Sequence, residues 1–173
     1  MCKMEHGLIH IYCGDGKGKT TACLGLSIRC AGHGNKVLFV QFLKSRLTGE
    51  LKSLELLSNI EVLRGKETKK FTFQMTADEK QEVLREHMRL FARINTKLEQ
   101  EEVRLLVLDE VTGVFDEGQL IDFLKNKPQS LEVVLSGRNP SSALLDLADY
   151  VSEVCKRKHP FDNGIAARVG IEK

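Results

Sequence analysis

A glycine-rich run with two lysines carries the clearest chemistry in the sequence. It reads Gly14-Asp15-Gly16-Lys17-Gly18-Lys19-Thr20-Thr21 and lies between an apolar run of strand length and a helical pattern. A loop of this composition directs successive backbone N–H groups into one concavity at the positive end of a helix, where phosphate oxygens bind. Lys19 adds a positive charge for the phosphates, and the Thr20 hydroxyl adds a ligand for Mg²⁺. The run therefore predicts a nucleotide phosphate site.

The run departs from the usual phosphate-loop pattern at one position. The pattern GxxxxGK[ST] has glycine five residues before Gly18, and this chain has Cys13 there. The alternative is a purely structural turn between a strand and a helix. Lys19 followed by Thr20 favours the phosphate site, because a structural turn has no need of that pair.

An apolar strand that ends in two acids supplies the second half of such a site. Leu105-Leu106-Val107-Leu108 is followed by Asp109 and Glu110. We expect these acids at the carboxyl ends of the strands, the edge at which ligands bind in open α/β sheets. There they can hold Mg²⁺ directly or through water, whereas the alternative is a pair of exposed acids at a strand end.

Short apolar runs alternate with helical patterns along the whole chain, which is typical of βαβ units. The predicted strands are residues 8–12, 36–42, 60–63, 103–108, 131–135 and 150–154. The predicted helices are residues 20–31, 50–57, 78–100 and 117–125, with a fifth through Leu147 that Ser141 caps. In the long helix, Val83, Leu84, Met88, Phe91, Ile94 and Leu98 form the apolar face. The pattern predicts an α/β fold with a mainly parallel sheet, in one domain over residues 1–173.

Composition narrows the class of protein. The 26 basic and 24 acidic residues leave a net charge of +2, which argues against a generally basic nucleic-acid binder. No apolar run is long enough to cross a bilayer and the N-terminus lacks a signal-peptide pattern, so we expect a cytoplasmic protein. The five cysteines have no CxxC spacing, which favours reduced thiols over a metal site.

These features do not identify the reaction, because kinases, ATPases, GTPases and helicases share the phosphate loop and the acid. The chain has no NKxD-like guanine motif and no evident arginine lid. Residues 65–76 have no clean period and are rich in Lys and Phe. This segment is either a functional loop or a disordered connector.

Further motifs, taken together, resemble those of a known family. They are the glycine-rich run, Ala31-Gly32-His33-Gly34, Val40-Gln41-Phe42-Leu43-Lys44, Leu108-Asp109-Glu110, Ser136-Gly137-Arg138, Leu147-Ala148-Asp149, Lys158-His159-Pro160-Phe161-Asp162-Asn163-Gly164 and Gly170-Ile171-Glu172. In this order they resemble the ATP:corrinoid adenosyltransferases of the bacterial cobalamin pathway, also called cob(I)yrinic acid a,c-diamide adenosyltransferases. That family tolerates a residue other than glycine at the position of Cys13.

The resemblance implies a fold, a reaction and a set of partners. The fold is a RecA-like P-loop fold with helices on both faces of the sheet, usually in a homodimer. The reaction moves the 5′-deoxyadenosyl group of ATP to Co(I) of a corrinoid, either cobalamin or cob(I)yrinic acid a,c-diamide, and releases triphosphate. ATP binds in the reverse sense, with its γ-phosphate where other P-loop proteins hold the α-phosphate. An electron donor must reduce the cobalt.

The resemblance also implies roles for single residues. Lys17, Lys19 and the loop amides, with Mg²⁺ on Thr20, Asp109 and Glu110, stabilise charge on the departing triphosphate. The residues expected to contact the corrinoid are Phe71, Phe73, Arg138, Lys158 and His159. The two phenylalanines would displace the lower axial ligand and make the cobalt easier to reduce. The alternatives are core anchors for the phenylalanines, a surface arginine and a solvated basic tail.

Three other functions stay open at this stage. An ATPase or kinase of the same fold would act on the γ-phosphate and release orthophosphate. A RecA-like nucleic-acid module would stack bases on Phe71 and Phe73. A corrinoid carrier or regulator without catalysis would keep its role after Lys19→Ala.

Overall fold

The computed structural model describes residues 6–42, 48–65, 76–112 and 115–172, and Phe71 and Phe73 lie outside these ranges. One six-stranded sheet has the strand order β3-β2-β4-β5-β1-β6, and each neighbouring pair is parallel. The strands are β1 (Ile9–Cys13), β2 (Val37–Gln41), β3 (Ile60–Arg64), β4 (Leu105–Thr112), β5 (Glu132–Gly137) and β6 (Tyr150–Glu153). The predicted parallel α/β fold is therefore confirmed.

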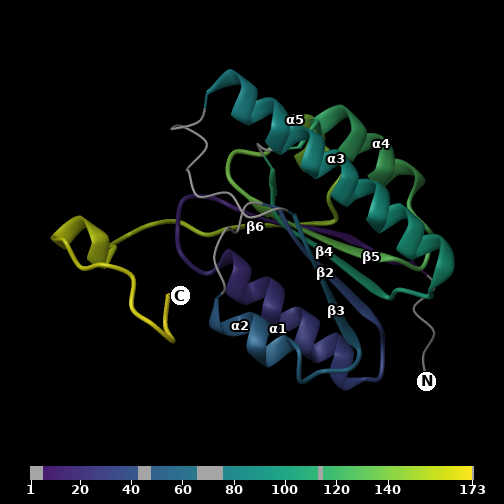
Figure 1. Ribbon diagram of the computed structural model, residues 1–173, viewed down its shortest axis with the longest axis horizontal. Helices are drawn as coiled ribbons and strands as arrows, with labels where there is room; N and C mark the ends of the chain where they lie inside the picture. The colour runs from purple at the N-terminus through teal and green to yellow at the C-terminus, as the bar shows by residue number, and fades with distance from the viewer. Residues whose placement is uncertain (1–5, 43–47, 66–75, 113–114, 173) are drawn as a thin grey trace.

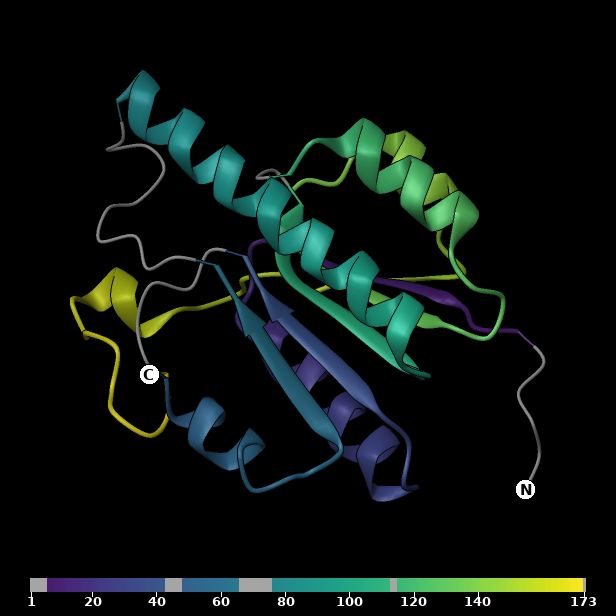
Figure 2. The same ribbon diagram turned by 45° about the vertical axis from the view of Figure 1, so that its right-hand side comes forward.

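Helices cover both faces of the sheet (Figure 1). The helices α1 (Lys19–Gly32) and α2 (Gly49–Leu54) lie on one face, and α3 (Ala77–Gln100), α4 (Glu117–Asn126) and α5 (Ser142–Asp146) lie on the other (Figure 2). A short 3₁₀ helix (Pro160–Asn163) follows β6 in a C-terminal segment that extends away from the sheet. All the predicted helices and strands are present, with ends that differ by a few residues.

Each face of the sheet has its own hydrophobic core. Phe39 and Val107 pack with Cys23 of α1 on one face, whereas Leu38 and Leu106 belong to the core under α3, α4 and α5. Every residue of β2 is buried, as expected for an inner parallel strand covered on both sides. This explains why β2 and the first half of β4 are continuous apolar runs, with Gln41 and Asp109 at or near their carboxyl ends.

Side-chain caps fix where the helices α3 and α5 begin. Ser141 accepts a hydrogen bond from the backbone N of Leu144, which confirms the predicted cap of α5. Thr76 and Glu79 form a capping box at the start of α3. The termini of these helices are thus specified locally by polar residues in the sequence.

Two expectations about elements are wrong in part. The third long strand does not end at the acid pair, because β4 continues to Thr112 through a register shift that follows Leu108. In α3, Leu84 and Met88 are exposed although they share the apolar spacing of Phe91 and Ile94, which are buried. The first half of α3 extends beyond the strands of the sheet (Figure 1), which agrees with the exposure of these two side chains.

The described cysteines agree with the prediction of reduced thiols. Cys13, Cys30 and Cys155 form no disulfide among the described residues. Burial raises the pKa of Cys30, and burial followed by the charge of Glu153 raises the pKa of Cys13. These thiols are therefore poor nucleophiles. Within the described ranges, no helix is both long and apolar enough to cross a membrane.

Candidate active site

The glycine-rich loop joins the carboxyl end of β1 to the first turn of α1. Gly16 N donates to the carbonyl of Val154, just after β6, at 2.7 Å. A Cβ atom at Gly14 or Gly16 would lie 2.6 or 2.7 Å from that carbonyl oxygen, and Gly14 and Gly18 have φ values of +100° and +129°. The loop thus requires glycine because its backbone is left-handed in part and packs closely against the end of β6.

Lys19 lies inside the loop, with only 6% of its surface exposed. Its Nζ donates to the carbonyl oxygens of Gly14 at 2.8 Å and Gly16 at 2.9 Å. An ammonium has three donors, so one N–H remains for a phosphate oxygen. The same side chain can therefore shape the loop and bind its ligand.

A buried chain of hydrogen bonds links α1, β4 and β5 below the loop. Thr20 Oγ1 donates to Asp109 Oδ1 at 3.0 Å, and Ser136 Oγ donates to the same oxygen at 2.6 Å. Asp109 is fully buried. With its proton directed at Asp109, the Thr20 hydroxyl keeps its lone pairs for a cation on the other side.

A backbone irregularity sets the position of Glu110. Its φ is +58°, rare for a residue with a side chain, and its backbone N donates to Ser136 Oγ at 3.0 Å. On the neighbouring strand β5, Gly137 also has a positive φ, at +153°. A Cβ atom at Gly137 would lie 2.0 Å from Thr112 Oγ1. As a result Glu110 lines the cleft described next, whereas Asp109 lies beneath it.

A cleft of about 690 Å³ opens over the loop. It is lined by Asp15, Gly16, Lys17, Gly18, Lys19, Thr20, Thr21, Leu24, Gly49, Glu50, Ser53, Glu110, Arg138, His159, Gly170, Ile171 and Glu172. Its size is in the range of small-molecule and cofactor sites. The loop, the strand ends, α2 and the C-terminal segment thus surround one space.

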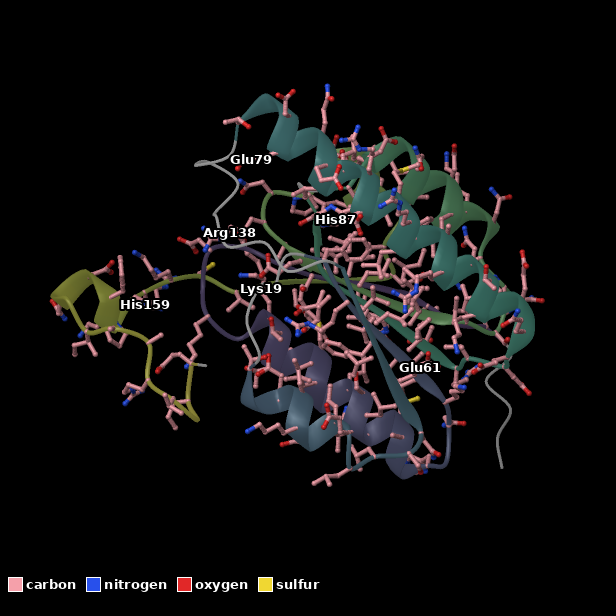
Figure 3. The ribbon with its side chains drawn as sticks, viewed as in Figure 1. Lys19, Glu61, Glu79, His87, Arg138 and His159 are labelled. Atoms are coloured by element: carbon pink, nitrogen blue, oxygen red, sulfur yellow. The ribbon has the colours of Figure 1, made fainter. Side chains whose placement is uncertain are left out.

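The structure brings most of the predicted site residues to this cleft. Lys19 and Arg138 lie at the same end of the sheet, and His159 reaches the cleft from the C-terminal segment (Figure 3). Lys158 is exposed and is not among the residues that line the cleft.

Gln41 is a polar residue of this region that the sequence analysis did not select as a site residue. It lies opposite Asp109 in the register of β2 and β4 and is 1% exposed, and its side-chain Nε2 and Oε1 have no hydrogen-bond partner among the described residues. A polar residue at the end of an apolar strand is the signal that selected Asp109, and it also marks Gln41 and Ser136.

Besides the hydrogen bond from Gly16 N to Val154 O, two side-chain contacts join the C-terminal segment to the loop, and the first is at Asp15. Asp15 Oδ1 accepts from the backbone N of Lys156 at 2.9 Å, and this hydrogen bond lowers the pKa of Asp15. The second contact joins Lys17 to Glu172, with 3.3 Å between Nζ and Oε1. Nothing in the spacing of the sequence indicates this second contact, because 155 residues separate its partners.

The fold and the loop together define a class of protein. A parallel α/β sheet with a glycine-rich loop before a helix that begins Lys-Thr, and an acid at the end of another strand, is the arrangement of P-loop nucleotide-binding proteins.

Comparisons with known proteins give the family. Residues 5–172 match the family model described as ATP:corrinoid adenosyltransferase BtuR/CobO/CobP. The chain is 32% identical to a corrinoid adenosyltransferase of Escherichia coli strain K12, over 97% of this chain and 86% of that protein. It is 33% identical to the corrinoid adenosyltransferase CobA of Salmonella typhimurium, with the same coverage, and 33% identical to one from a Sinorhizobium species, of which 81% is covered. The chain belongs to the ATP:corrinoid adenosyltransferase family.

Proposed function

We propose that this protein is a transferase that moves the 5′-deoxyadenosyl group of ATP to Co(I) of a corrinoid and releases triphosphate. The observation that carries the proposal is the match of residues 5–172 to the adenosyltransferase family, together with the glycine-rich loop in its cleft. Cobalamin and cob(I)yrinic acid a,c-diamide are the candidate corrinoids.

The chemistry needs no general base from the protein. The electron pair of Co(I) forms the bond to the ribose C5′, and the C5′–O bond breaks with its pair on the triphosphate. The cobalt formally becomes Co(III), and no proton moves in this step. The protein must therefore hold ATP with C5′ towards the corrin and stabilise the charge that develops on the leaving group.

The triphosphate is assigned to the glycine-rich loop. The buried Lys19 has an N–H available for a phosphate oxygen, and Lys17 lines the same cleft. Because the whole triphosphate leaves, contacts along its entire length lower the barrier. We place the γ-phosphate where other P-loop proteins hold the α-phosphate, so that the ribose lies at the opposite end of the triphosphate, facing the corrinoid.

Mg²⁺ fits the donors at the strand ends. The described residues hold no group of three or more His, Cys, Asp or Glu side chains suited to a metal ion. The Thr20 hydroxyl, with the carboxylates of Asp109 and Glu110, provides the few oxygen ligands that Mg²⁺ takes from a protein, and phosphate and water complete the set. Mg²⁺ would neutralise charge on the triphosphate. Thr20 and Glu110 would hold it directly, and Asp109, which accepts from the Thr20 hydroxyl, would orient Thr20 and hold the ion through water.

The charge balance of the cleft supports a cation. Among the described residues, its lining holds four carboxylates, from Asp15, Glu50, Glu110 and Glu172. Apart from His159, three basic side chains of the described lining oppose them, from Lys17, Lys19 and Arg138. A triphosphate adds further negative charge to this lining, so a divalent ion makes its binding favourable.

The corrinoid is assigned to the open side of the cleft. Arg138 and His159 line it there and can bind phosphate or corrin side chains, and we place Lys158 at its rim. Phe71 and Phe73, outside the described residues, are assigned to the lower face of the corrin, where they displace an axial ligand. Phe73→Ala should slow turnover that starts from Co(II) and spare turnover from pre-reduced Co(I). Equal loss in both assays would contradict this role.

The remaining assignments concern the setting of the enzyme. We propose a homodimer, a separate electron donor that reduces the cobalt, and a cytoplasmic location. Cys13, Cys30 and Cys155, which form no disulfide among the described residues, are consistent with a reducing compartment.

A direct assay tests the reaction. Purified protein is mixed anaerobically with Mg-ATP and chemically reduced cob(I)alamin, and the corrin spectrum and the phosphate product are followed together. The expected result is light-sensitive adenosylcobalamin with one triphosphate for each corrin converted. An unchanged corrin with released orthophosphate would indicate the other candidate, an ATPase or kinase acting on the γ-phosphate.

A further inference from the structure

The C-terminal segment leaves the glycine-rich loop and then returns to it. It starts at Val154, whose carbonyl accepts from Gly16 N, and at Lys156, whose backbone N binds Asp15. It then extends away from the sheet (Figure 1) and comes back at Gly170–Glu172, which line the cleft. The contact that closes this excursion is the ion pair between Glu172 and Lys17.

Glu172 is held in place at the cleft by a second cation. Arg168 Nη2 donates to Oε1 at 2.8 Å, while Arg168 Nε and the Arg168 backbone N donate to Oε2 at 3.1 and 2.9 Å. These hydrogen bonds, with a smaller contribution from Lys17, hold the pKa of Glu172 well below its ordinary value. The carboxylate is therefore ionised at neutral pH, and its side chain is only 18% exposed.

The partner of Glu172 is a cation of the phosphate loop. Lys17 lies between Gly16 and Gly18, its side chain is 50% exposed, and it lines the cleft over the loop amides. When the Lys17 ammonium binds a triphosphate, it moves towards the triphosphate and away from the Glu172 carboxylate. A triphosphate that stays close to Glu172 is also repelled by it. Glu172 and the triphosphate thus compete for Lys17.

We propose that Glu172 is a positioning residue that draws Lys17 away from the triphosphate and so speeds its release after adenosyl transfer. This inference rests on the proposed function, in which the whole triphosphate is a product. A product bound along its full length leaves slowly unless some contact is replaced. Glu172 replaces one such contact from within the chain, because Arg168 keeps its carboxylate 3.3 Å from Lys17.

Binding of inorganic tripolyphosphate tests the proposal without a corrinoid. Calorimetric titrations at one fixed MgCl₂ concentration would compare wild type with Glu172→Gln, a variant that keeps the shape of the side chain and removes its charge. We expect the Kd for tripolyphosphate to fall by about two- to five-fold, the range of an exposed ion pair, and its dissociation in stopped flow to slow by the same factor.

Two controls assign the effect to the contact with Lys17. Asp162→Asn removes one charge from the same segment, but the Asp162 carboxylate pairs with Lys156 instead. It should change the Kd by less than about 1.5-fold, since a remote exposed charge is screened. In a Lys17→Ala background, Glu172→Gln should give a smaller gain in affinity than in wild type, because only the direct repulsion between Glu172 and the triphosphate is then removed.

Three results would overturn the proposal. These are weaker tripolyphosphate binding by Glu172→Gln, an equal gain in the Lys17→Ala background, or no tripolyphosphate binding by any of these proteins. None of them depends on the adenosylation assay, which judges the proposed function separately.

Discussion

The two walls of the cleft are built in different ways. At the strand-end wall, which Thr20 and Glu110 line, support comes from beneath the cleft: Thr20 and Ser136 both donate to Asp109, and Asp109 and Ser136 are fully buried. The C-terminal wall is formed by Gly170, Ile171 and Glu172. There, exposed or partly exposed ion pairs such as Arg168–Glu172 hold the side chains in place. Buried hydrogen bonds to a charged group are strong and resist salt, whereas exposed ion pairs contribute little and are screened.

This difference indicates which part of the site is fixed before a ligand arrives. The strand-end wall forms with the hydrophobic cores, because Asp109 and Ser136 continue the same inner strands. The C-terminal wall rests on few contacts that a charged ligand can replace. We therefore expect variants of the strand-end wall to affect catalysis and stability strongly, and variants of the C-terminal wall to change affinity by small factors.

Lys19→Ala should have the largest effect. It removes the ammonium assigned to the triphosphate and also its hydrogen bonds to Gly14 O and Gly16 O. We expect kcat/KM for ATP to fall by about 100- to 1,000-fold, the cost of losing a group that stabilises charge in the transition state. Steady-state assays with cob(I)alamin measure this. Circular dichroism must show an intact fold, and activity within three-fold of wild type would contradict the role of Lys19.

Asp109→Asn should have the second largest effect on activity. The amide keeps the shape but removes the negative charge, and it presents a donor where Asp109 accepts from Thr20 and Ser136. We expect kcat/KM to fall by about 10- to 100-fold and the Mg²⁺ requirement to rise, as for other residues that orient a metal ligand. Mg²⁺ titrations of the activity measure both. Ser136→Ala, which removes one hydrogen bond, should cost less; an unchanged Mg²⁺ requirement in Asp109→Asn would argue against this role.

Gly137→Ala should lower stability. The new Cβ would meet Thr112 Oγ1 at 2.0 Å, in a backbone conformation with φ +153°. We expect the free energy of unfolding to fall by about 2–4 kcal/mol, from overpacking together with backbone strain. Urea denaturation checks this value. Gly164→Ala is the matched control, because its φ is also positive, at +77°, but nothing lies within 4 Å. If both variants lost the same free energy of unfolding, tight packing at Gly137 would not be the cause.

Asp15→Ala should have the smallest effect. It removes the acceptor for Lys156 N, a contact on the exposed C-terminal wall, while the loop amides remain. We expect kcat/KM to fall by less than about five-fold, as for other exposed polar contacts. Amide hydrogen exchange at Lys156 should become faster in the variant. Loss of activity comparable to that of Lys19→Ala would break the contrast between the two walls.

The same hydrogen bond has a definite pH dependence. Because the pKa of Asp15 is lowered in the folded protein, the contact is complete above the ordinary Asp value of 3.8 and is lost as the pH falls through the lowered value. Hydrogen exchange at Lys156, corrected for intrinsic rates, should therefore approach that of Asp15→Ala only in acid.

Local patterns in the sequence predict the elements and the strand-end wall well. The apolar runs, the caps and the glycine-rich loop depend on neighbours in the chain, and parallel pairing then brings Thr20 and Asp109 to one edge. The positive φ of Glu110 was not predictable, because it depends on packing between Thr112 and Gly137 on two strands.

The C-terminal wall was much less predictable. Glu172 meets Lys17 only after the segment leaves the sheet and returns, and neither spacing nor periodicity carries that information. Leu84 and Met88 follow the helical period as well as Ile94 does, but the sequence does not say how far the sheet extends beneath α3. Gln41, a buried polar residue that ends an apolar strand, shares with Asp109 a pattern that is visible in the sequence.

The most direct test of the account follows the carbon atom that is transferred. ATP labelled with ¹³C at the ribose C5′ is incubated anaerobically with the protein, MgCl₂ and cob(I)alamin, and the products are separated and observed by NMR. The account predicts that the label becomes bonded to cobalt and that unlabelled triphosphate is released in equal amount. Label that remains in ADP or AMP, with no labelled corrinoid, would contradict it.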